Sequence, residues 1–177
     1  MKRSIPSWQI AGFVFTSILG TFLHFLFELS GENMAAALFS AVNESIWEHM
    51  KLVYYPMFLF ALAEYRFWGK ETGDFWCVKL QGILLALTMI PAIYYLYTGI
   101  FGSSVGWLNI AIFFIAAAAA FRKETILFQK GTACHIPAGL AFSLILLTGA
   151  VFTTLTFATP RIPLFRDPLS GTYGFQG

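Results

Sequence analysis

Charged residues are scarce in this sequence. Asp, Glu, Lys and Arg make up 11% of its 177 residues, against 58% for hydrophobic residues. A soluble domain usually carries about 25% charged residues, so most of this surface cannot face water. The net charge of +2 is too small for a nucleic-acid surface, and the two cysteines are too few for a disulfide framework. The composition therefore favours an integral membrane protein whose partner is the lipid bilayer, with no nucleic-acid partner.

Five apolar stretches reach or approach the ~20 residues that a helix needs to cross the hydrocarbon core. They predict an all-α integral membrane bundle of five transmembrane helices, at residues 8–29, 46–68, 78–101, 105–121 and 136–158. No small-residue cleavage site follows the first stretch, so we interpret it as a retained span rather than a signal peptide. A sixth apolar segment is too short to cross; it predicts an interfacial or re-entrant helix, or an extension of the second span, at residues 34–42.

Proline and alanine predict details of the bundle. Pro56 and Pro91 lie inside the second and third spans and are expected to kink them, because proline cannot donate its backbone hydrogen bond. The span 105–121 is rich in alanine, which lets neighbouring helices approach closely, so we expect it at the centre of the bundle. Residues 1–158 then form the bundle, and the Pro- and Gly-rich residues 159–177 form a tail packed over its outer face.

The basic residues predict the orientation of the chain. If the N-terminus is cytoplasmic, the inner side carries eight of them, namely Lys2, Arg3, Arg66, Lys70, Lys79, Arg122, Lys123 and Lys130. The outer side carries only Lys51, Arg161 and Arg166. This bias follows the positive-inside rule and predicts the N-terminus inside and the C-terminus outside, in a cell membrane that we expect to be bacterial and cytoplasmic. Cys77 and Cys134 then lie near the inner face, where thiols stay reduced.

The densest group of polar side chains opens the second span. It consists of Asn43, Glu44, Ser45, Trp47, Glu48, His49 and Lys51. Asn43 is expected to cap the helix, and Glu44 to lie in its first turn, where the helix dipole favours negative charge. Helical spacing puts Glu44, Glu48 and Lys51 on one face. The group predicts a polar pocket or, alternatively, a solvated helix start that carries a Glu48–Lys51 ion pair.

A second pair of ionisable residues, His24 and Glu28, lies near the same membrane surface at the end of the first span. Ionisable residues at membrane depth are costly and usually face a partner or a cavity. A short connection joins the first two spans, so this pair could converge with the group that opens the second span. Two imidazoles with one carboxylate suit zinc or another divalent cation and leave a position for water. Alternatively, His24 is a hydrogen-bonded packing residue and Glu28 lies among the lipid headgroups.

The convergence predicts a role for each residue. His24 and His49 would be metal ligands, with Glu44 or Glu28 as the third ligand. Glu48 would be the general base, and Lys51 is a second catalytic candidate. The remaining polar residues would line or cover the pocket: Asn43, Ser45, Trp47, Arg161, Arg166 and Asp167. The tail arginines could fold back and neutralise the outer carboxylates; alternatively, the tail is a disordered terminus.

The motif Asn43-Glu44-Ser45-x-Trp47-Glu48-His49-x-Lys51, with a C-terminal Pro-x-x-Pro-x-Phe-x-Asp-Pro segment, resembles an uncharacterised family of small bacterial membrane proteins, a domain of unknown function. The resemblance covers nearly the whole chain and implies a multi-pass topology with no established activity.

A shorter stretch, residues 43–49, looks like the Asn-Glu-Thr…Ile-Trp-Thr-His segment of the progestin and adiponectin receptor family, which is related to alkaline ceramidases. In that family the His is a zinc ligand and the fold hydrolyses lipid amides. Only His49 matches a ligand position, with Ser45 as its neighbour. Those proteins have seven spans and a late His-x-x-x-His pair, which the fifth span here lacks.

Three functions remain open on the sequence alone. The first is a metal-dependent hydrolase with an outward-facing His/Glu pocket that acts on a lipid or another amphiphile. The second is a transporter or channel-like protein for a cation or small solute. The third is a non-catalytic subunit of a membrane complex.

Overall fold

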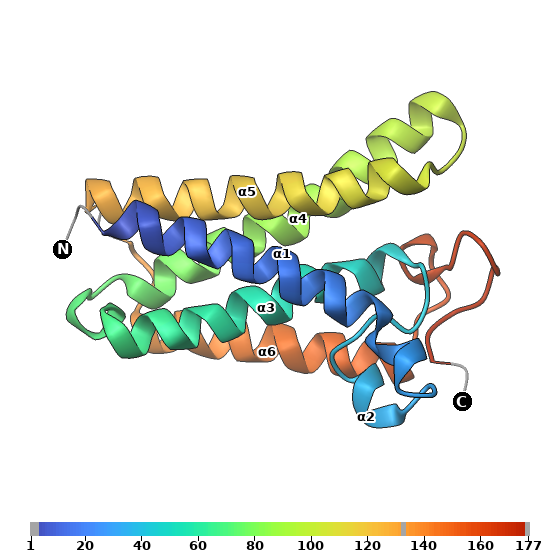
Figure 1. Cartoon of the computed structure of the whole chain (residues 1–177), viewed down its shortest axis with the longest axis horizontal. Helices are drawn as coiled ribbons and strands as arrows, with labels where there is room; N and C mark the ends of the chain where they lie inside the picture. The colour runs from blue at the N-terminus through green and yellow to red at the C-terminus, as the bar shows by residue number, and fades with distance from the viewer. Residues whose placement is uncertain (1–3, 132–133, 176–177) are drawn as a thin grey trace.

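The computed structural model describes residues 4–131 and 134–175, and within them it contains helices and no strand (Figure 1). The α-helices are α1 (Ile5–Leu29), α2 (Met34–Ala37), α3 (Ile46–Phe67), α4 (Phe75–Phe101), α5 (Gly106–Lys130) and α6 (Ala138–Phe157). Two short 3-10 turns are η1 (Gly69–Glu71) and η2 (Pro163–Phe165). The prediction of an all-α protein is therefore confirmed.

Each predicted span corresponds to one long helix, and three of these helices, α1, α4 and α6, are long and apolar enough to cross a membrane. These three helices indicate a membrane protein. The other two long helices, α3 and α5, carry more charged residues. The helix α5 also continues to Lys130, past the predicted end at Phe121, because charged residues interrupt the apolar run without interrupting the helix. Both α3 and α4 continue through their prolines, Pro56 and Pro91.

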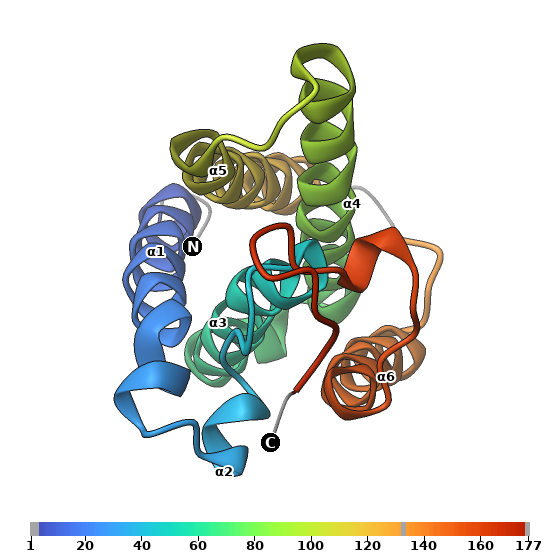
Figure 2. The same cartoon turned by 90° about the vertical axis from the view of Figure 1, so that its right-hand side faces the viewer.

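The helix α3 lies at the centre of the bundle, with α1, α4 and α6 packed around it (Figure 2). The alanine-rich α5 packs mainly against α4 and α1. The expectation that the alanine-rich span is central is therefore wrong: its alanines let it lie close to α4 and α1, while the larger side chains of α3 fill the middle. Buried side chains occupy most of α3, from Ile46 to Glu64.

Large apolar side chains cover the outside of the bundle. Examples with more than half of their surface exposed come from four of the long helices: Ile10, Ile18, Leu96, Ile100, Trp107, Ile110 and Leu147. Contiguous exposed apolar surface of this extent is unfavourable in water and suits contact with lipid.

Two lysines and two cysteines lie differently from the sequence expectation. Lys51 and Lys79, assigned to opposite membrane surfaces, are 0% and 2% exposed and lie inside the bundle. Cys77 and Cys134, expected as reduced thiols, are joined by a disulfide that links the start of α4 to the segment before α6. Lys2 and Arg3, which contribute to the charge bias, lie outside the described residues.

Candidate metal centre

His24, Glu44 and His49 come together at the end of the bundle where α1 ends and α3 begins, which we call the tail end. One ligand atom from each residue lies within 4.8 Å of the other two. His24 Nε2 is 3.7 Å from Glu44 Oε1, and His49 Nε2 is 3.4 Å from Glu44 Oε2. The two imidazole ring centres are 5.4 Å apart. We refer to these three residues as the histidine site.

The local chain geometry fixes the orientation of the His49 ring. Its Nδ1 lies 2.9 Å from the carbonyl oxygen of Ser45, and a carbonyl can only accept, so Nδ1 carries the proton. Nε2 is then the ring nitrogen that lies near Glu44. A backbone carbonyl that fixes the tautomer in this way is the usual outer partner of a metal-binding histidine.

The start of α3 differs from the prediction. Ser45, not Asn43, is the N-cap, and its side chain accepts a hydrogen bond from Glu48 N. Asn43 instead accepts a hydrogen bond from Ser45 N and donates one to the carbonyl of Gly174 in the tail. Glu44 therefore precedes the helix. Its carboxylate turns toward the two histidines instead of sharing a face with Glu48.

An apolar groove of about 230 Å³ adjoins the histidine site between α1, α3 and α5. Thr21, His24, His49 and Asn109 supply its polar lining. The remaining lining is mostly apolar and includes Phe25, Leu52, Ile110, Phe113 and Phe114. The groove can therefore accept an apolar group whose polar end reaches the two imidazoles.

The predicted catalytic residues Glu48 and Lys51 lie away from the histidines. Lys51 Nζ is 2.6 Å from Glu48 Oε2 and donates hydrogen bonds to Ala37 O and Thr156 Oγ1, each at 3.0 Å. Thr156 donates to Glu48 Oε1 at 2.9 Å, and Val42 N donates to Glu48 Oε2 at 3.2 Å. We call Glu48 and Lys51 the buried pair, since both are enclosed by protein. Its partners are all structural, so the structure does not place a general base there.

Two other predicted residues, Glu28 and Trp47, differ in their relation to the histidine site. Glu28 lies one helical turn beyond His24 on α1, is exposed, and is close enough for its charge to act on the His24 ring. Trp47 is buried between the rings of Phe152 and Phe165, with both ring centres 4.6 Å away. Trp47 thus anchors the tail to the bundle and does not line the groove.

The C-terminal tail packs across the end of the bundle where α1 ends and α3 begins (Figures 1 and 2). Phe165 is buried against Trp47, and Phe175 N donates to the carbonyl of Thr156. Asp167 Oδ1 accepts hydrogen bonds from the backbone N–H groups of Leu169 and Ser170, at 2.7 and 3.3 Å. The carboxylate thereby holds the tail in a compact turn.

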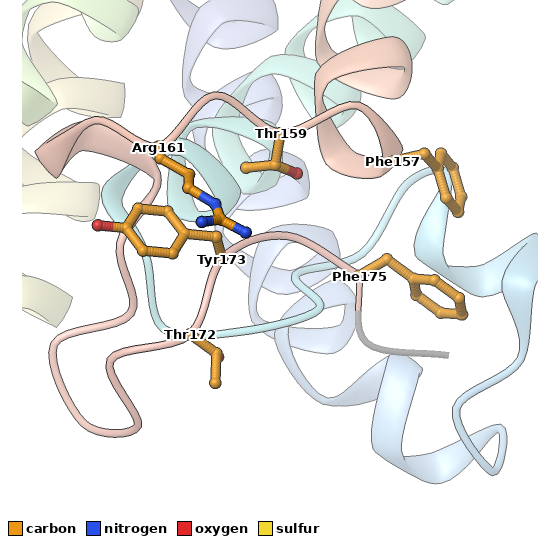
Figure 3. Close-up of a pocket in the computed structure, with 6 residues that line it drawn as sticks. All are labelled: Phe157, Thr159, Arg161, Thr172, Tyr173 and Phe175. Atoms are coloured by element: carbon orange, nitrogen blue, oxygen red, sulfur yellow. The ribbon is translucent and has the colours of Figure 1, made fainter.

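The tail arginines do not neutralise the outer carboxylates. Within residues 4–131 and 134–175, neither Arg161 nor Arg166 forms an ion pair with an acidic side chain. Arg161 lines a surface cavity of about 460 Å³, together with Phe157, Thr159, Thr172, Tyr173 and Phe175 (Figure 3). That cavity has no His, Cys, Asp or Glu in its lining, so it has no metal-binding group.

Sequence reasoning missed an ionic cluster at the opposite end of the bundle. Lys79 forms ion pairs with Glu64 and with Glu124, the latter at 2.5 Å, and Gln9 Nε2 donates to Glu64 Oε1 at 2.7 Å. We call Glu64, Lys79 and Glu124 the buried triad. Lys79 was assigned to the inner membrane surface, but Lys79 and Glu64 are each at most 2% exposed. The spacing of Phe121, Glu124 and Phe128 on one helical face is a signal that could have shown Glu124 to face inward.

Comparison with known protein families gives a match that covers residues 1–175. The chain belongs to the family of unknown function DUF6512. No curated protein matches it, and no solved structure matches it.

Proposed function

We propose that this DUF6512 protein binds a divalent cation at the histidine site. The observation that carries the proposal is the convergence of two imidazoles and one carboxylate, with ligand atoms within 4.8 Å of one another. Two nitrogens and one oxygen suit zinc and leave a fourth position for water. Small side-chain rotations would bring the three ligand atoms to about 2.0–2.2 Å from a zinc ion placed between them, the usual zinc–nitrogen and zinc–oxygen distances.

The groove supports a hydrolytic role on an amphiphile. Its apolar walls suit an acyl or similar chain, and its polar end lies at His24 and His49, where a bound metal would hold water. Zinc lowers the pKa of its water to about 7, which supplies a nucleophile for an ester or amide bond. Glu28 is the remaining carboxylate near His24 and takes the role of general base in this proposal.

The proposed topology has five spans, with the N-terminus in the cytoplasm of a bacterial cell and the C-terminus outside. The charge bias supports it, whereas a disulfide at the end assigned to the cytoplasm is unusual. Single cysteines at Lys70 and at Ser170, in a background without the native cysteines, would be exposed to a membrane-impermeant thiol reagent in intact cells. Labelling of Ser170→Cys alone supports this orientation, and labelling of Lys70→Cys alone reverses it.

Metal content tests the site directly. Purified protein in detergent should retain about one zinc per chain after dialysis against a weak chelator. His24→Ala and His49→Ala should abolish this binding. The third histidine offers a matched control, because His135 is exposed and precedes α6 at the opposite end. Wild-type protein without bound metal, or equal metal loss in His135→Ala, would overturn the proposal.

Activity tests the chemistry separately from binding. The zinc-loaded protein should cleave long-chain ester or amide substrates and leave short-chain analogues intact. Glu28→Gln should keep the metal and lose turnover, because it removes the base without removing a ligand. Turnover that survives in Glu28→Gln would refute the assigned base, while failure of every substrate would leave a metal-binding protein without this chemistry.

A transporter is the second candidate, and the buried triad favours it. Transport needs polar groups within the membrane, and two carboxylates and an ammonium lie inside the bundle. A cation flux into vesicles that depends on both the histidine site and Glu124 would support transport. The same flux in protein-free vesicles would exclude it.

A further inference from the structure

The buried triad contains more negative than positive charge. Three helices supply its members: Glu64 from α3, Lys79 from α4 and Glu124 from α5, and Gln9 of α1 donates a hydrogen bond to Glu64. Among the described residues, Lys79 is the one cation paired with either carboxylate, and α1 contributes only the neutral Gln9. With every group ionised, the cluster would hold a net charge of −1 out of contact with water. An uncompensated buried charge is strongly unfavourable.

The aromatic surroundings increase this cost. The Lys79 ammonium lies 5.6–5.7 Å from the ring centres of Phe75, Phe121 and Phe128. These rings favour the cation and offer no hydrogen-bond donor to a second carboxylate. The cluster must therefore reduce its negative charge in another way.

The hydrogen bonds show which of the two carboxylates, Glu64 or Glu124, can lose its negative charge. Both oxygens of Glu64 are engaged, one by Gln9 and one by Lys79. Glu124 Oε2 contacts Lys79, but Glu124 Oε1 is buried, lacks a hydrogen-bond partner and packs against Gly82. We propose that Glu124 binds an exchangeable proton, so that the triad is a neutral proton-binding site at neutral pH.

A proton fits this place better than a metal ion. The Lys79 ammonium already lies between the two carboxylates and would repel a second cation. A proton bonds to Glu124 Oε1 and leaves the ion pair between Lys79 and Glu64 unchanged. It comes from hydronium and releases only water, so no other reactant is needed. The members lie within two turns of the ends of their helices, so local opening suffices for exchange.

Infrared spectroscopy of the purified protein tests the proposal without any variant. Wild-type protein in detergent at neutral pH should show the carbonyl stretching band of one protonated carboxyl group per chain. The band should shift when glutamate is labelled with ¹³C and should stay in place when aspartate is labelled. A spectrum without this band between about pH 5 and pH 8 would overturn the proposal, because every carboxyl is then ionised.

Variants assign the proton to Glu124. Glu124→Gln should remove the band, whereas Glu71→Gln, which changes an exposed carboxyl near the same end, should retain it. Gly82→Ala is the second variant, because the atoms nearest to its methyl group would be those of the flexible Glu124 side chain. It should shift the band without removing it. A band that is unchanged in Glu124→Gln or in Gly82→Ala assigns the proton elsewhere.

Discussion

The buried pair and the buried triad solve the same problem in different ways. The pair, Glu48 and Lys51, has one charge of each sign, and all three donors of the Lys51 ammonium have acceptors. The triad has two acids for one base, and Glu124 Oε1 has no hydrogen-bond partner. The buried pair therefore has the balanced charge and complete hydrogen bonding of a structural element. The buried triad has one surplus negative charge and one carboxylate oxygen without a partner, and both features favour the binding of a proton.

Removing the cation should have the largest effect, and it should be larger in the triad. Lys51→Met leaves one buried carboxylate without its partner, which costs about 3–5 kcal/mol. Lys79→Met also leaves one ionised carboxylate, Glu64, because Glu124 holds a proton. It removes in addition the contacts of Lys79 with Glu124 and with three phenylalanine rings, so its loss should exceed that of Lys51→Met. Thermal unfolding in detergent measures both, with the exposed Lys70→Met as control. An equal or smaller loss in Lys79→Met would contradict the distinction.

Removing both members of the pair should cost less than the sum of the two single losses. In Glu48→Gln/Lys51→Met no charge remains buried, so the double variant should recover about 1–3 kcal/mol relative to the sum of the single variants. Unfolding free energies of the three variants complete this cycle. Strict additivity would show that Glu48 and Lys51 do not stabilise each other.

Replacing Glu124 should have a small effect at neutral pH. Glutamine has the shape of a protonated glutamic acid, so Glu124→Gln should change stability by less than about 1 kcal/mol. Glu48→Gln should cost more, because it leaves Lys51 unpaired in the pair that is already balanced. The same unfolding assay compares the stability losses of Glu124→Gln and Glu48→Gln. The reverse ranking would mean that the ionised form of Glu124 stabilises the protein.

The comparison also shows what sequence could and could not predict. Apolar run length predicted all five long helices, and the short spacing between the first two brought His24 near His49. The position of a charged side chain inside or outside the bundle was not predictable in the same way. Glu64 and Lys79 lie close to the ends of apolar runs, where sequence alone cannot distinguish a loop from the last buried turn. Their partners come from other helices, so no local pattern marks them.

Asp167 provides a third case, a carboxylate that is satisfied without a cation. Burial alone raises the pKa of Asp167, but hydrogen bonds from Leu169 N and Ser170 outweigh it and lower this pKa below its ordinary value of 3.8. The ionised form is therefore favoured in the folded state. Its stabilisation is fully present above the ordinary pKa and is lost as the pH falls through the lower native pKa.

Asp167→Asn should consequently have a modest effect, about 1–2 kcal/mol at neutral pH, because the amide oxygen still accepts a hydrogen bond. The gap in Tm between wild type and Asp167→Asn should narrow as the pH falls below the ordinary pKa. Asp74→Asn is the matched control, since the Asp74 side chain forms no cap hydrogen bond at the start of α4. A gap that widens in acid would show that the protonated form holds the tail. The backbone N–H groups would then stabilise the Asp167 carboxylate less than Lys51 stabilises that of Glu48, because hydrogen bonds act on the first and an opposite charge acts on the second.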